Sequence, residues 1–446
     1  MAAKERQRRR RESKAKKAWR LLRDAPTNID DLPDDLLECV LLRLAASSPL
    51  CLIRAAFACK RFRRLVADAR FRSLVDGGRP GGGPAVLGHY YTLDRPANCR
   101  HHPPVSDPPF VPSSPSPSPS IGHRFSLDYL PFDRPRELID SHGSLLLFVN
   151  GPWGTRWGDR HYPRFPDLLV CEPLTRRFQG IARMPPPLGS LVFCGAYLIA
   201  GGGGGGGGVG MSNYRVLCMF GELACVFSPG IDGGWRFVDT AAKYGDGEDV
   251  EFPEDTQFVG RAAGKIYWWA SGGLVQVFDE ATATFFLMEF PEHMRWEYRK
   301  SNLRVIGGVD GGGGIRVVRM TGEDLEIYGE SGGGEWAVER SVRLADATRG
   351  LPGRQEVFFT AEAPAARIVT AGGDGFVTLA PAEDETWLFS VDLETMEAER
   401  DHGRNKHVGE AHPCSPPPLA AVLRASGVGD ATRTEKSGRR TLQSLF

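Results

Sequence analysis

The sequence has no apolar run long enough to cross a membrane. Its longest apolar runs, such as residues 145–149, are far shorter than the ~20 residues that a transmembrane helix needs. The first residues are basic rather than apolar, so they do not have the pattern of a secretory signal peptide. We therefore expect a soluble intracellular protein that does not bind membranes.

Cysteine is also scarce. The chain has nine cysteines, an odd number, and no two of them are spaced C-x-x-C. A small secreted domain held by disulfides would have more cysteines, in an even number. We predict that these residues are reduced and that most of them are buried as small apolar side chains.

Motifs of catalysis are missing as well. There is no G-x-S-x-G and no H-E-x-x-H, and residues 260–266 resemble a phosphate loop only in part, so we expect a β-hairpin there. His402, His407 and His412 are spaced by five, which fits neither a helical pair nor a Cys/His finger. We predict no metal, no cofactor and no enzymatic activity.

The charges balance overall but are unevenly distributed. The 55 basic and 55 acidic residues cancel, yet residues 1–23 contain eleven Lys and Arg and only two Glu, so the rest of the chain is acidic. An acidic body argues against nucleic-acid binding. Residues 1–27 are predicted to be a disordered basic tail, which is either simply solvated or a nuclear-import signal, placing the protein in the nucleus, the cytoplasm or both. The import candidates are Arg8, Arg9, Arg10, Arg11, Lys16 and Lys17.

Glycine and proline are abundant, with 54 and 33 residues. Because both residues interrupt helices, a mostly helical protein is excluded and a turn-rich β protein is favoured. Two stretches are predicted to be low-complexity insertions, namely the Pro/Ser-rich residues 94–123 and the polyglycine loop at 201–208. Residues 413–446 are predicted to be a disordered tail.

Residues 28–76 differ from the rest because their apolar residues recur at helical spacing. Leu36, Leu37, Val40, Leu41 and Leu44 form one apolar stripe, and two shorter stripes follow. We predict three short helices here, followed by a linker at 77–84. Because such a small helical unit buries little surface, we expect a partner to cover part of its apolar face.

Residues 85–412 have a β pattern throughout, in which short apolar runs alternate with Gly/Asp turns. An acidic residue followed three positions later by threonine recurs at 172–175, 279–282 and 392–395, where both side chains can stabilise a tight turn. The repeats predict about six four-stranded blades of a closed, propeller-like domain.

Glycine-centred hairpins are expected at Gly143, at Gly264 and at 373–375. Residues 86–93 read as an isolated strand before the Pro/Ser insertion. Because a closed sheet ring leaves no open edge, we predict that this strand completes the final blade.

The helical segment resembles an F-box. The similarity rests on Leu32-Pro33, on residues 34–44, on residues 52–66 with Cys59-Lys60-Arg61-Phe62, and on the closing Phe71. Phe62 replaces the tryptophan that is usual in the family. The resemblance implies that the domain docks on a Skp-type adaptor through Leu32, Pro33, Leu36, Leu37, Val40, Leu41, Leu44, Ile53, Cys59 and Phe62.

The remainder is similar to the β-propeller-like domains that follow plant F-boxes. Residues 140–147 resemble their D-x-x-x-G-LLL strand, and residues 169–178 resemble their V-x-N-P-x-T strand, with Glu172 in place of the asparagine. The expected fold is therefore a multidomain α+β protein: a small three-helix F-box, then an all-β propeller-like domain, with disordered tails.

This resemblance implies a function in protein recognition. The chain would be the substrate receptor of a Skp–cullin–F-box ubiquitin ligase, joined through the adaptor to a cullin–RING ligase and binding a protein client through its β domain. Two other readings stay open: an F-box protein that acts outside ubiquitylation, and a carbohydrate-binding or enzymatic propeller with a helical cap. The sequence does not identify the client or the residues that bind it.

Overall fold

The computed structural model divides the chain into two compact units, Met1–Gly78 and Arg79–Phe446. We call them the helical unit and the β unit. The predicted N-terminal tail, residues 78–84 of the predicted linker, most of the polyglycine loop and residues 418–446 lie outside the described residues, whereas residue 77 of that linker ends a helix. The structure describes residues 29, 32–47, 49–77, 86–92, 107–113, 125–131, 136–150, 166–184, 193–201, 209–220, 223–230, 234–240, 257–270, 274–294, 302–308, 314–330, 335–359, 364–371 and 375–417.

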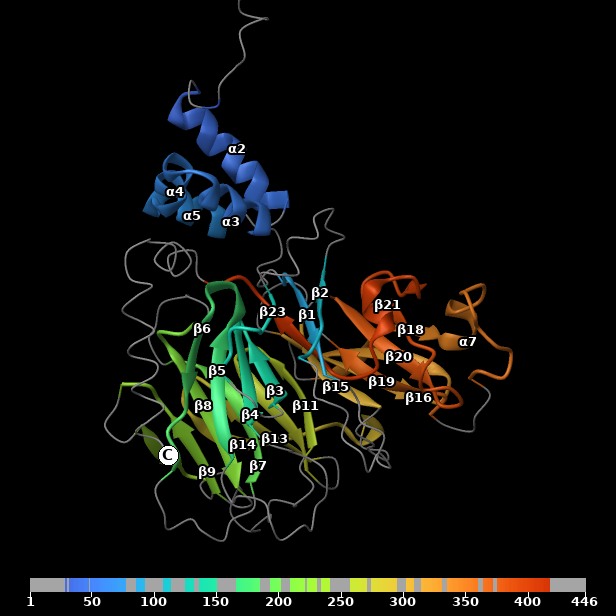
Figure 1. The fold of residues 1–446 in the computed structure, drawn as a ribbon. Helices are drawn as coiled ribbons and strands as arrows, with labels where there is room; N and C mark the ends of the chain where they lie inside the picture. Colours follow the sequence, from blue (N-terminus) through green and yellow to red (C-terminus); the bar gives the residue numbers. More distant parts are fainter. Residues whose placement is uncertain are drawn as a thin grey trace, which may run out of the picture. The chain divides into compact units, whose positions relative to one another are not determined.

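The helical unit consists of short helices that pack on one another (Figure 1). Their inward side chains form its core: Leu37, Leu41, Ala45, Leu52, Ile53, Ala56, Val66 and Phe71. The helices are α2 (Asp34–Ser47), α3 (Pro49–Ala58), α4 (Lys60–Ala67) and α5 (Ala69–Gly77).

Asp68 accounts for the difference from the three predicted helices. Its backbone is extended (ψ 135°), which ends α4. Its Oδ1 then accepts hydrogen bonds from the backbone N–H groups of Arg70, at 2.9 Å, and Phe71, at 3.3 Å, at the start of α5. An aspartate that caps a helix in this way satisfies N–H groups that the first turn leaves unpaired. The third predicted helix is therefore two helices.

The β unit is built from sheets of four consecutive antiparallel strands. The first two are β3 (Arg136–His142), β4 (Leu145–Asn150), β5 (Asp167–Glu172) and β6 (Arg177–Gly180), then β7 (Phe193–Ala200), β8 (Tyr214–Phe220), β9 (Leu223–Phe227) and β10 (Trp235–Val238). The next are β11 (Gln257–Ala262), β12 (Lys265–Trp269), β13 (Leu274–Asp279) and β14 (Thr284–Glu289), then β15 (Leu303–Gly307), β16 (Ile315–Thr321), β17 (Asp324–Glu330) and β18 (Trp336–Arg343). The last is β19 (Ala366–Ala371), β20 (Phe376–Pro381), β21 (Phe389–Asp392) and β22 (Ala398–Glu399).

Two of these sheets join at one point. Gly260 on β11 pairs in parallel with Val305 on β15, so the eight strands from β11 to β18 form one continuous sheet. Gly260 has φ +153°, and a Cβ atom added there would lie 1.9 Å from the Val305 carbonyl oxygen. Only glycine allows this approach of the two backbones.

A further sheet joins the two ends of the β unit. Strand β1 (Gly88–Tyr91) lies between β2 (Phe110–Pro112) and β23 (Ala411–Cys414), and it is antiparallel to both. The prediction that residues 86–93 complete the final blade holds only in part, because β1 does pair with β23 at the end of the β unit, but in a sheet separate from β19–β22. We call these three strands the closing sheet.

The closing sheet corrects two sequence-based boundaries. The predicted domain end at 412 falls inside β23, and the Ser415 N–H donates to the Gly143 carbonyl at 2.8 Å, so the β unit continues past 412 into the predicted tail. Strand β2 lies inside the predicted Pro/Ser connector 94–123. Its Phe110 ring stacks on Phe125 at 4.1 Å and lies 5.0 Å from Tyr90, which explains why this part of the insertion is ordered.

The predicted turn repeats are present. The Oδ1 atom of Asp392 accepts from the backbone N–H of Thr395 at 2.8 Å, and Asp279 makes the same contact with Thr282 at 3.1 Å. In each of the three turns the residue after the threonine has a left-handed backbone: Arg176, Ala283 and Met396. The glycine hairpins are likewise left-handed, at Gly143, Gly264 and Gly375.

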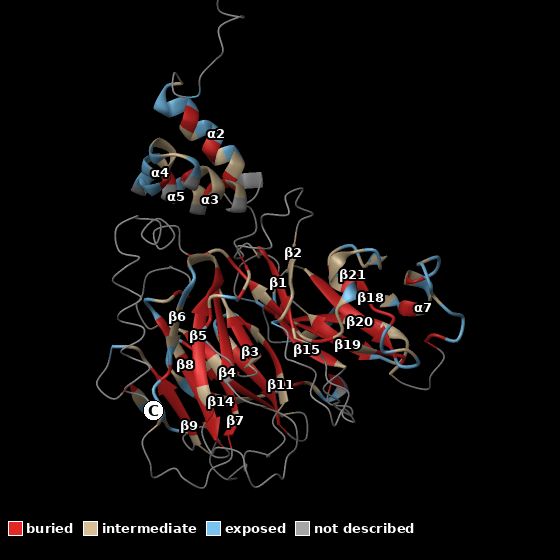
Figure 2. Ribbon diagram, viewed as in Figure 1, coloured by how far each residue is buried: buried red, intermediate tan, exposed pale blue. Residues whose placement is uncertain are grey.

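Several neighbouring sheets contact one another through the first strands of their four-stranded units. Strand β3 packs beside β7, β11 beside β15, β15 beside β19, and β23 beside β3. Most strand residues are buried in the described part of this unit (Figure 2). The described residues thus form five four-stranded units, two of them joined in the eight-stranded sheet, and the three-stranded closing sheet; the arrangement is propeller-like, but one of the predicted four-stranded blades has only three strands. Among the described residues, no helix is long and apolar enough to cross a membrane.

Candidate functional site

The beginning of α2 is held in place by an arginine from α4. The Nε atom of Arg61 donates to Asp34 Oδ1 at 2.8 Å, and its Nη2 donates to the carbonyl oxygen of Leu32. Arg64 also binds Asp34, at 3.1 Å. The hydrogen bond from Arg61 is the main reason that the pKa of Asp34 lies below its ordinary value. The Leu32-Pro33 segment is thereby fixed to the body of the helical unit.

Helix α2 has two apolar faces rather than the single stripe predicted. Leu37 and Leu41 are each 1% exposed and belong to the core, whereas Leu36 is 51% exposed and Val40 is 47% exposed. Figure 2 shows this alternation of buried and exposed positions along α2. Positions 33, 36 and 40 recur at helical spacing, so Pro33 continues the outward face. Exposed apolar side chains on one helix face are typical of a protein-binding surface.

The predicted adaptor-binding residues therefore separate by burial. Three of them are exposed: Pro33, Leu36 and Val40. Four are half-buried: Leu32, Leu44, Cys59 and Phe62. The remaining three are core residues and face the interior, which corrects their assignment to the surface: Leu37, Leu41 and Ile53.

Cys59 has a structural role that the sequence did not indicate. Its Sγ accepts a hydrogen bond from the Phe62 backbone N–H at 3.4 Å and so caps α4. Two exposed apolar residues were also absent from the predicted set, namely Ile29, 50% exposed, and Leu74, 44% exposed. On α5 the core residue Phe71 is buried, whereas Leu74, three positions later, faces outward.

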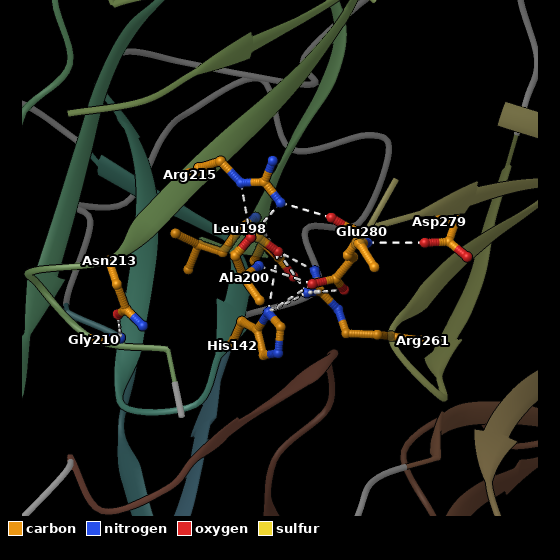
Figure 3. A network of polar contacts seen from close by, with 11 residues as sticks. His142, Leu198, Ala200, Gly210, Asn213, Arg215, Arg261, Asp279 and Glu280 are labelled. Carbon is orange, nitrogen blue, oxygen red and sulfur yellow. Dashed lines mark hydrogen bonds and ion pairs between the residues drawn. The ribbon is translucent and has the colours of Figure 1, made fainter. Parts of the chain in front are cut away.

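The β unit contains a second concentration of polar side chains, centred on Arg261 (Figure 3). Arg261 on β11 donates to Asp140 Oδ2 on β3 at 2.9 Å and to Glu280 Oε1 at 3.2 Å. It also donates to the Leu198 carbonyl oxygen on β7 and to His142 Nδ1. This network joins three successive sheets through their first strands.

Burial shifts the pKa values of two side chains in the Arg261 network. It raises the pKa of Asp140 to about 6, although the nearby Arg261 opposes the shift. It lowers the pKa of His142 to about 3, assisted by the positive charge of Arg261. Glu280 also accepts from the Ala200 N–H at 2.9 Å. We call the hydrogen bonds and ion pairs of Arg261 the inter-sheet lock, because their polar atoms are directed at one another across neighbouring sheets. The resemblance included Asp140, but nothing in the sequence linked it to Arg261.

The described residues of the β unit expose few large apolar side chains. Phe237 on β10 is 66% exposed, Val338 on β18 is 47% exposed, and Val357 is 53% exposed. Among the described residues, no group of histidine, cysteine and acidic side chains is arranged to hold a metal ion. The predicted import residues Arg8–Arg11, Lys16 and Lys17 lie outside the described residues.

Comparison with known proteins identifies one domain. The F-box domain family matches residues 29–74, which contain the outward face of α2. The chain matches no curated protein sequence. The match lies within the helical unit.

Solved structures resemble the chain only distantly. A functionally unknown protein from Desulfotomaculum acetoxidans is 11% identical, with 63% of this chain and 76% of that one covered and a TM-score of 0.33. YCF48 from Cyanidioschyzon merolae is 13% identical, with 63% and 88% covered and a TM-score of 0.33. AztD from Citrobacter koseri is 11% identical, with 65% and 62% covered and a TM-score of 0.27. Likeness at this level says nothing about function.

Proposed function

We propose that this chain, which carries an F-box domain at residues 29–74, is the substrate-recognition adaptor of a Skp–cullin–F-box ubiquitin ligase. F-box domains generally bind Skp-type adaptors. The observation that supports this role most directly is the exposed apolar face of α2, formed by Pro33, Leu36 and Val40, within the residues that match the family.

Burial of that face would stabilise the complex with the adaptor. Covering a Leu or Val side chain that is half exposed contributes a part of the ~1.5–3 kcal/mol that full burial of such a side chain provides. Arg61 contributes by holding the Leu32-Pro33 segment, so the face is preformed and little conformational freedom is lost on binding. The core residues Leu37 and Leu41 support the face from behind.

In this proposal the β unit binds the client protein, as in plant-type F-box proteins with an associated propeller-like domain. Its sheets are stabilised by apolar cores that neighbouring sheets share and by the Arg261 network, so the connecting loops can vary without loss of the fold. The chain would bind and position the client, and the associated ligase would carry out ubiquitin transfer.

Adaptor capture tests the proposal. The variant Leu36→Glu/Val40→Glu should lose capture of a Skp-type adaptor, because an unpaired carboxylate in an apolar interface is strongly unfavourable. Val338→Glu is the matched control, since Val338 has the same 47% exposure as Val40 but lies on the β unit. Both variants should keep the wild-type melting temperature. Undiminished capture by the double variant would refute the α2 face as the binding surface.

A second measurement separates the ligase role from the alternative. Co-purification of a cullin with the wild-type chain, together with a bound client that accumulates when the proteasome is inhibited, is expected for a substrate receptor. Capture of the adaptor without cullin would instead support an F-box protein that acts outside ubiquitylation.

We also propose nuclear entry through the basic N-terminal residues. The cluster Arg8–Arg11, with Lys16 and Lys17, has the charge density that import receptors recognise. A fluorescent fusion in which Arg8–Arg11 are replaced by alanine should shift toward the cytoplasm. Equal distributions of the wild-type and mutant fusions would leave the segment as a solvated tail.

A further inference from the structure

Strand β14 forms one edge of the eight-stranded sheet. Among the described strands it is hydrogen-bonded only to β13, so its other side is an edge of the sheet. Backbone N–H and C=O groups along such an edge can pair with a strand of another chain. Natural proteins usually prevent this with a bulge, a proline, a charged side chain within the strand or a very short edge strand.

The edge of β14 has none of these protective features. Its six residues pair with β13 in one continuous register, without a bulge. The four residues in its middle, Phe285–Met288, are all apolar, and polar residues stand only at the two ends, Thr284 and Glu289. The strand therefore presents a regular apolar edge, which is the kind that another strand can extend.

The last strand of every other four-stranded unit does have such a feature. Strand β18, at the opposite end of the same sheet, pairs with a shift of register beside Ile327 and carries the exposed Arg340. Strand β10 has the exposed Arg236 within its four residues. Strands β6 and β22 are short, with four and two residues. The unprotected edge is thus specific to β14 among these strands.

The hydrogen bonds of the neighbouring hairpin show which way the backbone of Leu287 points. The Ala270 N–H donates to the Leu274 carbonyl oxygen at 2.9 Å, so the even-numbered residues of β13 bond to β12. In an antiparallel sheet the odd-numbered residues of β13 then bond to β14, and their register partners on β14 are even-numbered. Leu287, at an odd-numbered position, therefore directs its N–H and C=O away from β13, toward the edge.

The side chains of β14 are already held by the β unit. Phe285 is buried, and the next three residues are half-buried. Phe286 and Met288 pack against the core that includes Tyr267 and Val305. Because this packing orders the strand in advance, a partner strand would bind with little loss of conformational freedom in β14.

The sequence of β14 is complementary to itself. In an antiparallel pair opposite residues share a face of the sheet, so a two-fold axis normal to the sheet pairs residues whose numbers differ by an even amount. An axis at Leu287 places this residue opposite its own copy and Phe286 opposite Met288. Glu289 then lies opposite Phe285, so both central kinds of pair are apolar and no two carboxylates face each other.

We propose that two copies of this chain associate through β14, antiparallel about a two-fold axis at Leu287, so that their eight-stranded sheets become continuous. The self-complementary register favours a second copy over an extended segment of another protein. The inference goes beyond the proposed function and is independent of adaptor binding. A particle of two chains carries two F-box domains and two β units, so it would bind a multivalent partner with avidity.

Sedimentation velocity of the full chain tests this pairing. Because the contact is small, the mass of the wild type should rise from one chain to two between about 1 and about 100 μM. Leu287→Lys and Leu287→Glu each place like charges opposite each other, so each alone should raise the dimer Kd at least about tenfold. An equimolar mixture of the two variants should recover the dimer, because lysine then faces glutamate.

Recovery in the mixture is specific to a pairing of Leu287 with itself. Phe237→Lys is the matched control, since it adds the same charge to the edge strand β10 at a ring that is 66% exposed, and it should keep the wild-type Kd. A wild type that stays monomeric throughout would overturn the proposal. So would a dimer that the Leu287 variants leave intact, or a mixture that is no more dimeric than either variant alone.

Hydrogen exchange of the wild type provides a measurement without any substitution, should the Leu287 variants fail to fold. The peptide that covers β14 should gain protection by at least about tenfold when the concentration is raised from well below the dimer Kd to well above it. The peptide that covers β10 should exchange equally at both concentrations. Equal protection of β14 at both concentrations would refute pairing at this edge.

Discussion

Arg61 and Asp34 connect α4 to the first turn of α2 through a hydrogen bond of 2.8 Å, and the same guanidinium binds the carbonyl oxygen of Leu32. One side chain thus fixes both the start of the helix and the segment that precedes it. The outward residues Leu36 and Val40 follow directly on this fixed turn. Arg61 consequently determines how the apolar face is presented, although its charge is not part of that face.

Replacing Arg61 should weaken adaptor binding without removing any residue of the face. Arg61→Met loses the contacts to Asp34 and Leu32, so the Leu32-Pro33 segment gains freedom that binding must remove. We expect a higher Kd for a Skp-type adaptor in a titration. Arg64→Met is the control, because Arg64 contacts Asp34 from a side chain that is 72% exposed. An equal effect of the two substitutions would contradict the positioning role of Arg61.

Phe110 should be important for the closing sheet even though it lies in a Pro/Ser-rich segment. Phe110→Ala removes the stacking on Phe125 and the tilted ring contact with Tyr90, and it should destabilise the β unit by about 2–3 kcal/mol in denaturant unfolding. Phe237→Ala, at a ring that is 66% exposed, should change stability by less than about 0.5 kcal/mol. Equal stabilities would show that β2 is dispensable.

Arg261 should be indispensable to the inter-sheet lock. Arg261→Met leaves Asp140 and Glu280 buried without their cation, which should cost about 3–5 kcal/mol at neutral pH. Arg183→Met is the control. It breaks an ion pair with Asp167 of 2.6 Å, but the arginine is 58% exposed, so the loss should stay within about 1 kcal/mol.

The loss of stability caused by Arg261→Met should also depend on pH. Burial already raises the pKa of Asp140 to about 6, and removing the cation raises it further. The folded variant then binds a proton that the unfolded chain, with a pKa near 3.8, does not bind. The difference in unfolding free energy between the wild type and the variant should therefore become smaller as the pH falls from 7 toward about 5. Unfolding curves at both pH values measure this, and a constant deficit would argue against charge burial as the cause.

Replacing Gly260 by alanine should destabilise the β unit much more than the same replacement at Gly322, another glycine with a positive φ. Gly260→Ala would place a methyl group against the Val305 carbonyl and separate β11 from β15. Gly322→Ala meets no atom within 4 Å, so it incurs only the backbone strain of φ +61°, about 1 kcal/mol. The melting temperature should fall further for Gly260→Ala than for Gly322→Ala. Equal falls would mean that the close approach contributes nothing.

Local patterns in the sequence predicted features that depend on neighbouring residues. In the turns at 279–282 and 392–395 the aspartate side chain accepts from the backbone N–H groups two and three positions later, so the composition of four residues is sufficient to indicate these turns. Helical spacing located α2 in the same way. The sequence also predicted the pairing of the first strand with the last, because a ring of sheets must be closed.

The tertiary structure alone decided which apolar residues of α2 face outward and which polar groups meet inside the β unit. Leu36 and Leu37 are adjacent and chemically identical, and only the positions of α3, α4 and α5 bury one and expose the other. Arg261 and Asp140 are 121 residues apart, and no local pattern relates them. They meet because sheet packing brings the first strands of separate sheets together, a long-range arrangement that depends on the whole β unit and not on any short segment of it.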